Sequence, residues 1–422
     1  MFSGRDLPHS SRYSARLLNG RSPQVDGALS SRWLASPRWI AGAAFLVVTG
    51  LVLARLQVRG DAFDHVWAED GKVFLSDAER HGLASLSYVY AGSLLTVPRV
   101  LAIAGEALPI RDYATYTVLV SALVVGALAA FVYLTAAKVL GSAAWAAVPA
   151  LGMALTPALA VESLGNLANL EWFLIFAAFW AMLVPPRGTR PYVATIVAGL
   201  AALASPVAVL VAPAAVVAHG RKDALRSWPL LALLAGEVIQ VIGIGFGSRS
   251  ASGPARRGVS LHTAKSLFGH LFRGVLGPAY GPSSVRFVAG AVIGALLVWA
   301  WWLARRRRRL ASVSLMTGLL ILCAISAITG QSNGRYSAIA AMFVIAGLAC
   351  LGPRLDRRAA VGSLVLLFLL CLVSFPADGH RLSGPSWSAA IARHDTECRR
   401  LRLAATDLPL SPPGWTVRLA CS

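Results

Sequence analysis

Long apolar runs, separated by short polar segments rich in arginine, dominate the chain from residue 39 to residue 376. A helix needs about 20 mainly apolar residues to cross the ~30 Å hydrocarbon core of a bilayer. The pattern therefore predicts an all-α polytopic membrane protein with about eleven spans. The predicted spans are 39–55, 113–137, 143–160, 169–185, 191–204, 206–218, 228–247, 286–304, 310–330, 336–352 and 359–376.

The stretch 191–218 is too long for one comfortable span, and Ser205-Pro206 interrupts it, so it is interpreted as a tight hairpin of two short spans. Basic residues support this choice, because positive charge accumulates on the cytoplasmic side of a membrane protein. With the N-terminus inside, the cytoplasmic segments carry 20 basic residues and four acids, whereas the external segments, together with the span ends beside them, carry 19 basic residues and 14 acids. A single span would instead move the five-arginine run 305–309 outside.

The resulting topology has a cytoplasmic N-terminus, an external C-terminus and three predicted parts. Residues 1–36 are rich in Ser, Arg and Gly and are predicted to be a disordered cytoplasmic segment. Residues 37–376 form the transmembrane domain, with external loops 56–112 and 248–285, and residues 377–422 form a small external subdomain. In the first loop, the apolar stretch 93–108 is interrupted by Pro98-Arg99 and is expected to be a helix at the membrane interface.

Composition agrees with a location in the cell membrane, because 56% of the residues are hydrophobic and only 14% are charged. The net charge of +20 does not indicate nucleic-acid binding, since the arginines form short clusters between apolar runs without a basic face. The lipid bilayer is therefore the expected partner. Cys398 and Cys421 lie in the polar tail and are expected to pair if that tail is exported.

The first external loop contains the segment Trp67-Ala-Glu-Asp-Gly-Lys-Val-Phe-Leu75. Glu69 and Asp70 are flanked by Trp67 and by apolar residues, which predicts a partly buried pair of carboxylates beside the membrane. A carboxylate in a low-dielectric site can have a raised pKa and act as a general base toward a sugar hydroxyl. The alternative is structural, with Asp70 capping a helix that begins near Lys72.

The second external turn reads Glu162-Ser-Leu-Gly-Asn166-Leu-Ala-Asn169-Leu-Glu171-Trp172. If it is helical, then Glu162, Asn166 and Asn169 share one face, where they could bind hydroxyls or complete a metal site with Asp70. Otherwise the same residues end two helices and satisfy backbone groups.

Arg335, at the external end of a span, is a candidate phosphate ligand because its guanidinium can bind two oxygens. The alternative is an arginine that anchors a helix end.

These segments, with Tyr90-Ala-Gly-Ser-Leu-Leu-Thr-Val-Pro98-Arg99, resemble parts of uncharacterised multi-pass membrane proteins of actinobacteria. The layout of residues 39–376 is similar to that of the GT-C superfamily of glycosyltransferases. The resemblance implies sugar transfer from a polyprenyl-phosphate donor to a glycan or protein acceptor of the cell envelope on the outer face. It implies Asp70 or Glu69 as the base, Glu162 as a second acid and Arg335 as a donor-phosphate contact. From the same loop-one and second-turn segments, Asn166, Asn169, Trp67 and Lys72 are expected to bind substrate. No cofactor is expected, and a divalent metal is not indicated, because loop 248–285 contains no Asp or Glu.

Two other functions remain open from the sequence. A membrane transporter or a flippase for lipid-linked sugars is suggested by Glu237 inside a predicted span and by the broken stretch 191–218. A non-catalytic membrane scaffold is the third hypothesis.

Overall fold

The computed structural model describes residues 37–58, 60–160, 162–185, 191–248, 309–329, 334–355, 357–376 and 379–421. The predicted N-terminal segment 1–36, the span 286–304 and nearly all of loop 248–285 lie outside these residues. The described part of the chain is mostly helical and contains helices long and apolar enough to cross a membrane.

Helices occupy every predicted apolar run within the described residues. The helices in these runs are α1 (Pro37–Gln57), α4 (Tyr113–Leu140), α5 (Ala143–Leu155), α6 (Leu170–Met182), α7 (Tyr192–Ala204), α8 (Ala212–His219), α10 (Trp228–Phe246), α13 (Arg309–Thr329), α14 (Gly334–Leu351) and α15 (Arg357–Val373). The segments Trp39–Gln57, Ile110–Leu140 and Trp228–Phe246 have the length and hydropathy of complete spans. Helix formation follows from the apolar composition, because a backbone in lipid must satisfy its own hydrogen bonds.

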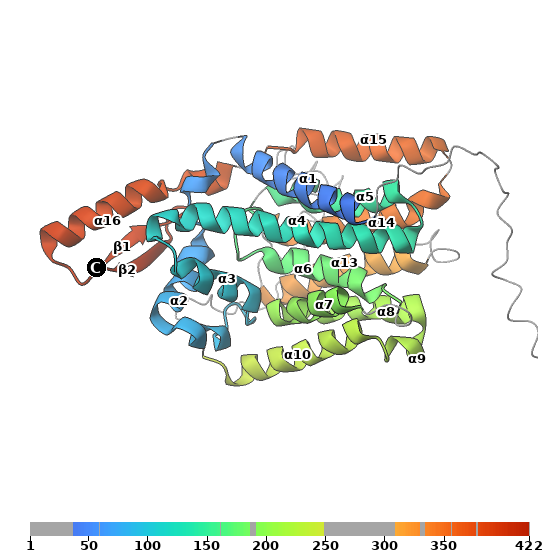
Figure 1. The fold of residues 1–422 in the computed structure, drawn as a ribbon, viewed down its shortest axis with the longest axis horizontal. Helices are drawn as coiled ribbons and strands as arrows, with labels where there is room; N and C mark the ends of the chain where they lie inside the picture. The colour runs from blue at the N-terminus through green and yellow to red at the C-terminus, as the bar shows by residue number, and fades with distance from the viewer. Residues whose placement is uncertain are drawn as a thin grey trace, which may run out of the picture. The chain divides into compact units, whose positions relative to one another are not determined.

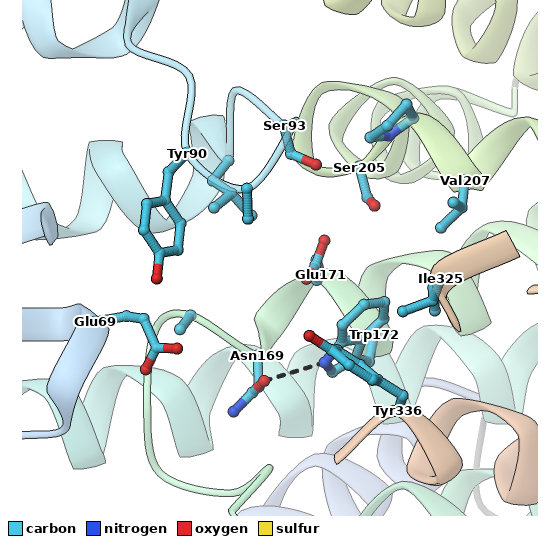
Figure 2. Close-up of a pocket in the computed structure, with 15 residues that line it drawn as sticks. Glu69, Tyr90, Ser93, Asn169, Glu171, Trp172, Ser205, Val207, Ile325 and Tyr336 are labelled. Atoms are coloured by element: carbon cyan, nitrogen blue, oxygen red, sulfur yellow. Dashed lines mark hydrogen bonds between the residues drawn. The ribbon is translucent and has the colours of Figure 1, made fainter. Parts of the chain in front are cut away.

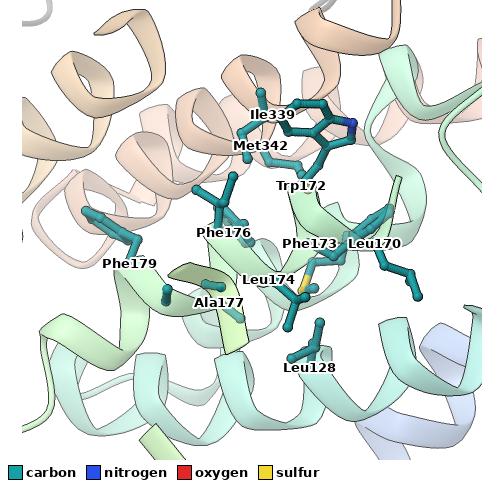
Figure 3. Close-up of a cluster of buried hydrophobic side chains, with 14 of the residues drawn as sticks. Leu128, Leu170, Trp172, Phe173, Leu174, Phe176, Ala177, Phe179, Ile339 and Met342 are labelled. Carbon is teal, nitrogen blue, oxygen red and sulfur yellow. The ribbon is translucent and has the colours of Figure 1, made fainter. Parts of the chain in front are cut away.

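Helix α6 forms the centre of the packed helices and is buried along almost its whole length. Figure 3 shows its side chains between Leu128 of α4 and Ile339 and Met342 of α14. Phe176 and Phe179 both meet the ring of Phe343 edge to face, at centroid distances of 5.5 and 5.3 Å. A helix that is apolar all round belongs in such a core.

Other helices keep large apolar side chains on the surface. Helix α10 packs against α7 (Figure 1), but Val238, Ile239, Val241 and Ile242 remain at least half exposed. Helix α15 exposes Val365, Leu366 and Phe368 in the same way. Apolar surface of this extent is typical of a protein embedded in lipid rather than in water.

The stretch 191–218 breaks where its sequence indicates. Helix α7 ends at Ala204, Ser205 has an extended backbone, and a 3-10 helix, η6 (Pro206–Val211), leads into α8. Pro206 can occupy the first position of η6 because that position needs no N–H donor. The short helix α9 (Arg221–Ala224) then connects α8 to α10.

The first loop is largely helical and includes the helix expected within 93–108. Its elements are η1 (Ala62–Asp64), a π-helical turn η2 (Asp70–Leu75), α2 (Ser76–His81), η3 (Gly82–Ser87), α3 (Thr96–Glu106) and η4 (Ile110–Asp112). Arg99 of α3 is buried and forms an ion pair with Asp77 of α2, with 2.8 Å between Nη1 and Oδ2. This pair holds α3 against α2.

The C-terminal subdomain corrects the all-helical expectation. After η8 (Gly379–Ser383) and α16 (Trp387–Leu401), strands β1 (Ala405–Pro409) and β2 (Thr416–Ala420) form an antiparallel hairpin. Both strands alternate buried and exposed positions, the pattern of a sheet with one covered face. The disulfide Cys398–Cys421 joins α16 to the residue after β2. The remaining short elements are η5 (Pro157–Ala160) and η7 (Gly352–Arg354).

Candidate functional site

A pocket lies where several helix ends meet (Figure 2). Its empty volume is about 630 Å³, open solvent included. The pocket is lined by residues from loop one, the second external turn, the tip of the α7–η6 hairpin, α13 and α14: Glu69, Tyr90, Ala91, Gly92, Ser93, Leu95, Ala168, Asn169, Glu171, Trp172, Ser205, Pro206, Val207, Ile325 and Tyr336. Helices α6, η6 and α14 begin at or near this pocket, and α7 and α13 end near it.

Two carboxylates line this pocket. Glu69 comes from the first loop, directly before the π-helical turn, and its side chain is buried. Glu171 lies in the first turn of α6, where the positive end of the helix dipole favours a negative charge. Figure 2 shows Glu69 below Tyr90 and Glu171 between Ser205 and Trp172.

Three aromatic rings line the same pocket. Trp172 and Tyr336 meet edge to face with centroids 5.9 Å apart. The indole Nε1–H of Trp172 donates a hydrogen bond of 3.1 Å to Oδ1 of Asn169, which fixes the ring (Figure 2). Tyr90 rests edge to face on Phe74 at 6.5 Å. Rings held in this way offer rigid apolar faces beside the carboxylates.

Asp70 is next to Glu69 in sequence but lies outside the pocket lining, with a side chain that is fully buried. Its carboxylate accepts hydrogen bonds from the backbone N–H of Leu167, at 3.1 and 3.0 Å, and from that of Ala168, at 3.1 Å. Burial raises the pKa of Asp70 to about 7, against the lowering effect of these hydrogen bonds and of Arg381. The hydroxyl of Tyr113 donates to the backbone carbonyl of Asp70. Asp70 therefore does not cap its own helix; it binds the second external turn.

Arg381, from the C-terminal segment, is the buried cation that acts on Asp70. Its Nη1 donates to the carbonyl of Gly165 at 2.8 Å, and its Nη2 donates to the carbonyl of His65 at 2.9 Å. Burial lowers its pKa to about 10, so the guanidinium is charged at neutral pH. One side chain thus connects the C-terminal segment, loop one and the second external turn.

The second external turn is not helical between Glu162 and Asn169. The prediction that Glu162, Asn166 and Asn169 share one helical face is therefore wrong. The side-chain amides of Asn166 and Asn169 both donate to the carbonyl of Glu162, at 2.6 and 2.9 Å. The N–H of Asn169 in turn donates to Oδ1 of Asn166. Gly165 adopts a φ of +75°, a conformation that glycine tolerates and other residues rarely adopt. The asparagines therefore satisfy backbone groups, which is the structural alternative.

The other residues expected at the site lie in different places. Trp67 is buried near the C-terminal segment, where its backbone bridges to Ser411, and Lys72 lies over the ring of Trp415 at 5.3 Å. Neither they nor Glu162 line the pocket. Arg335 belongs to the first turn of α14, directly before the pocket residue Tyr336, and its side chain is outside the described part of the structure.

Three residues of the pocket and its surroundings were not predicted from the sequence. Glu171 is part of the second external turn, but a helical turn places Glu162, and not Glu171, on one face with Asn166 and Asn169. Tyr90 belongs to the segment 90–99, whose sequence contains no pattern that indicates a chemical role for it. Arg381 carried no local signal, because its partners are more than 200 residues away in the chain.

Within the described residues, His394, Cys398 and Cys421 are the one group of three side chains whose possible metal-ligand atoms lie close together. The two cysteines form the disulfide, so their sulfurs are not thiolate ligands. This group is therefore a structural part of the C-terminal subdomain.

Comparisons of the chain with models of protein families, with curated proteins and with solved structures found no match.

Proposed function

We propose that this chain is a multi-pass membrane glycosyltransferase that works in the pocket lined by Glu69 and Glu171. The observation that carries this proposal is the presence of two carboxylates and three aromatic rings in one pocket at the helix ends. Carboxylates accept hydrogen bonds from sugar hydroxyls, and aromatic faces pack against the C–H faces of sugar rings. A small number of polar groups among apolar walls is typical of a ligand site.

Glu69 is the proposed general base. It accepts the proton of an acceptor hydroxyl while the oxygen of that hydroxyl bonds to the anomeric carbon of the donor sugar. The bond from that carbon to the phosphate oxygen breaks, and polyprenyl phosphate leaves with the electron pair. Glu69 is preferred to Asp70 because it lines the pocket, whereas both oxygens of Asp70 accept backbone N–H groups of the second turn.

The placement of the pocket supports an external site. Its lining comes from loop one, the second turn, the 205–207 tip and the ends of α13 and α14. The arginine distribution assigns all of these segments to the outer side of an eleven-span protein in the cell membrane. A lipid-linked donor would approach from the bilayer, and Arg335 is kept as the proposed ligand of its phosphate because it directly precedes Tyr336.

The test is transfer of labelled sugar in membranes that contain the full-length protein, supplied with a panel of polyprenyl-phosphate monosaccharides. Glu69→Gln is expected to reduce transfer by roughly 100-fold or more, the usual contribution of a general base. Glu171→Gln is expected to weaken acceptor binding. Glu106→Gln, at the exposed end of α3, is the matched control and keeps full activity. Equal transfer by Glu69→Gln and the control would overturn the proposal.

A transporter or flippase of lipid-linked sugars is the second candidate, favoured by the helix break at Ser205-Pro206, which lines the pocket. Broken helices at a pocket are common in transporters. Glu237 belongs to α10, which packs against η6, the element that follows this break. Transport in proteoliposomes that fails with Glu237→Gln but survives Glu69→Gln would support this candidate. If neither change has an effect on transfer or transport, the scaffold hypothesis is favoured.

A further inference from the structure

The two external segments that form the pocket are joined by one buried carboxylate. Asp70 follows the pocket residue Glu69, and its oxygens accept the N–H groups of Leu167 and Ala168. Ala168 itself lines the pocket, and so do three residues that follow it within the next four positions. The contact therefore fixes the wall that carries Glu171 relative to the wall that carries Glu69.

The C-terminal segment supplies the countercharge for this carboxylate. Arg381 is 5% exposed, and its two terminal nitrogens donate to Gly165, in the second turn, and to His65, in loop one. It therefore contacts the same two segments that Asp70 joins. Within the described part of the chain its Nε–H has no hydrogen-bond partner, so hydrogen bonds alone do not explain the burial of this side chain. The negative charge of Asp70 also favours the charged guanidinium of Arg381.

We propose that Asp70 and Arg381 are positioning residues that hold the walls of the pocket together, so that the C-terminal segment is part of the construction of the site. This inference takes its functional meaning from the proposed reaction, but it concerns the assembly of the pocket and is tested without that reaction. It also gives Asp70 a role other than that of the base.

Among the described residues, three ionisable groups act electrostatically on Asp70: Arg381 from the C-terminal segment, Glu69 beside it, and Tyr113 of α4. Arg381 favours the charged carboxylate, and Glu69 disfavours it. If the contact between Asp70 and the second turn opens and water reaches the carboxylate, the pKa of Asp70 returns from about 7 toward the ordinary 3.8. This opening therefore releases a proton. The equilibrium constant for opening rises with pH up to about pH 7 and is constant above it.

The experiment is hydrogen–deuterium exchange of the full-length protein in lipid nanodiscs, followed in peptides that contain Leu167 and Ala168. Arg381→Met is expected to speed exchange of these amides by roughly tenfold or more, because it leaves a buried carboxylate without its cation. Asp70→Asn with Arg381→Met is expected to return exchange to within about threefold of wild type, because both charges are removed together.

Asp64→Asn is the matched control, since Asp64 also joins loop one to the C-terminal segment, through two 2.7 Å hydrogen bonds to Ser388, and its described hydrogen bonds do not include the second turn. It is expected to leave exchange at Leu167 unchanged. In wild type, exchange corrected for its intrinsic pH dependence is expected to rise up to about pH 7, and Asp70→Asn alone is expected to remove this rise.

Faster exchange in the double variant than in Arg381→Met alone would overturn the proposal, and so would a pH profile that Asp70→Asn does not change. If Arg381→Met does not fold, the double variant and the pH profile of Asp70→Asn decide the question. Loss of the proposed sugar transfer does not affect these readouts, so failure of one proposal is distinguishable from failure of the other.

Discussion

Replacing Asp70 by asparagine is expected to increase the free energy of unfolding relative to that of wild type, by an amount that grows as the pH rises. In the folded protein the pKa of Asp70 is about 7, whereas its ordinary value is 3.8. The folded state therefore holds a proton between about pH 4 and pH 7 that the unfolded state has released. Stability falls over this range in wild type, because deprotonation places a charge in a fully buried position. Asparagine has no such proton, so the variant lacks this decrease.

The magnitude follows from the two pKa values. They differ by about 3, and a difference of one corresponds to about 1.4 kcal/mol. The free energy of unfolding of the Asp70→Asn variant, relative to wild type, should therefore increase by about 4 kcal/mol between pH 4 and pH 8. The asparagine Oδ1 can still accept a hydrogen bond from the second turn, so the substitution changes the charge more than the contacts.

The assay is denaturant unfolding of wild type and variant in detergent at a series of pH values, followed by tryptophan fluorescence. Asp64→Asn, on the same loop, is the control and should show no such divergence from wild type. If the stability difference between Asp70→Asn and wild type stays constant from pH 4 to pH 8, the raised pKa and the reasoning from burial are refuted.

Three further predictions concern the parts that support the pocket. Arg99→Met is expected to lower the free energy of unfolding by about 3 kcal/mol or more, because it removes the buried ion pair with Asp77; a loss below about 1 kcal/mol would contradict this. Gly165→Ala should cost roughly 1–2 kcal/mol in the same assay, since φ is +75° there, and an unchanged stability would show that the turn adapts. Replacing Cys398 and Cys421 by serine should lower the free energy of unfolding by about 3 kcal/mol and make the C-terminal hairpin more sensitive to limited proteolysis. Equal cleavage rates in wild type and variant would contradict this prediction.

Much of the fold was predictable from local pattern. The apolar runs gave helices wherever the structure describes them, because helix formation in an apolar environment depends on properties within each run. The break at Ser205-Pro206 and the amphipathic helix α16 follow from local sequence as well. The alternation of polar and apolar residues in Thr416–Ala420 is a local signal for a strand as well, although the chain was expected to be all-helical.

The candidate site was predictable only in part. The sequence indicated two of the segments that line the pocket, loop one and the second external turn, because polar residues concentrate there between apolar runs. It did not indicate which side chains enter the pocket. Glu69 lines the pocket and Asp70 does not, although the two are adjacent in sequence and equally suited to act as a base.

The sequence alone determined that this is a helical, membrane-like protein with polar segments between its apolar runs, since hydrophobic length and charge placement are local properties. Only the tertiary structure decided that Glu69 and Glu171 share a pocket, and that Arg381 lies beside Asp70 across 311 positions of the chain. The physical reason is that burial and electrostatic pairing depend on which distant segments pack together. No periodicity within loop one or the C-terminal segment specifies that contact.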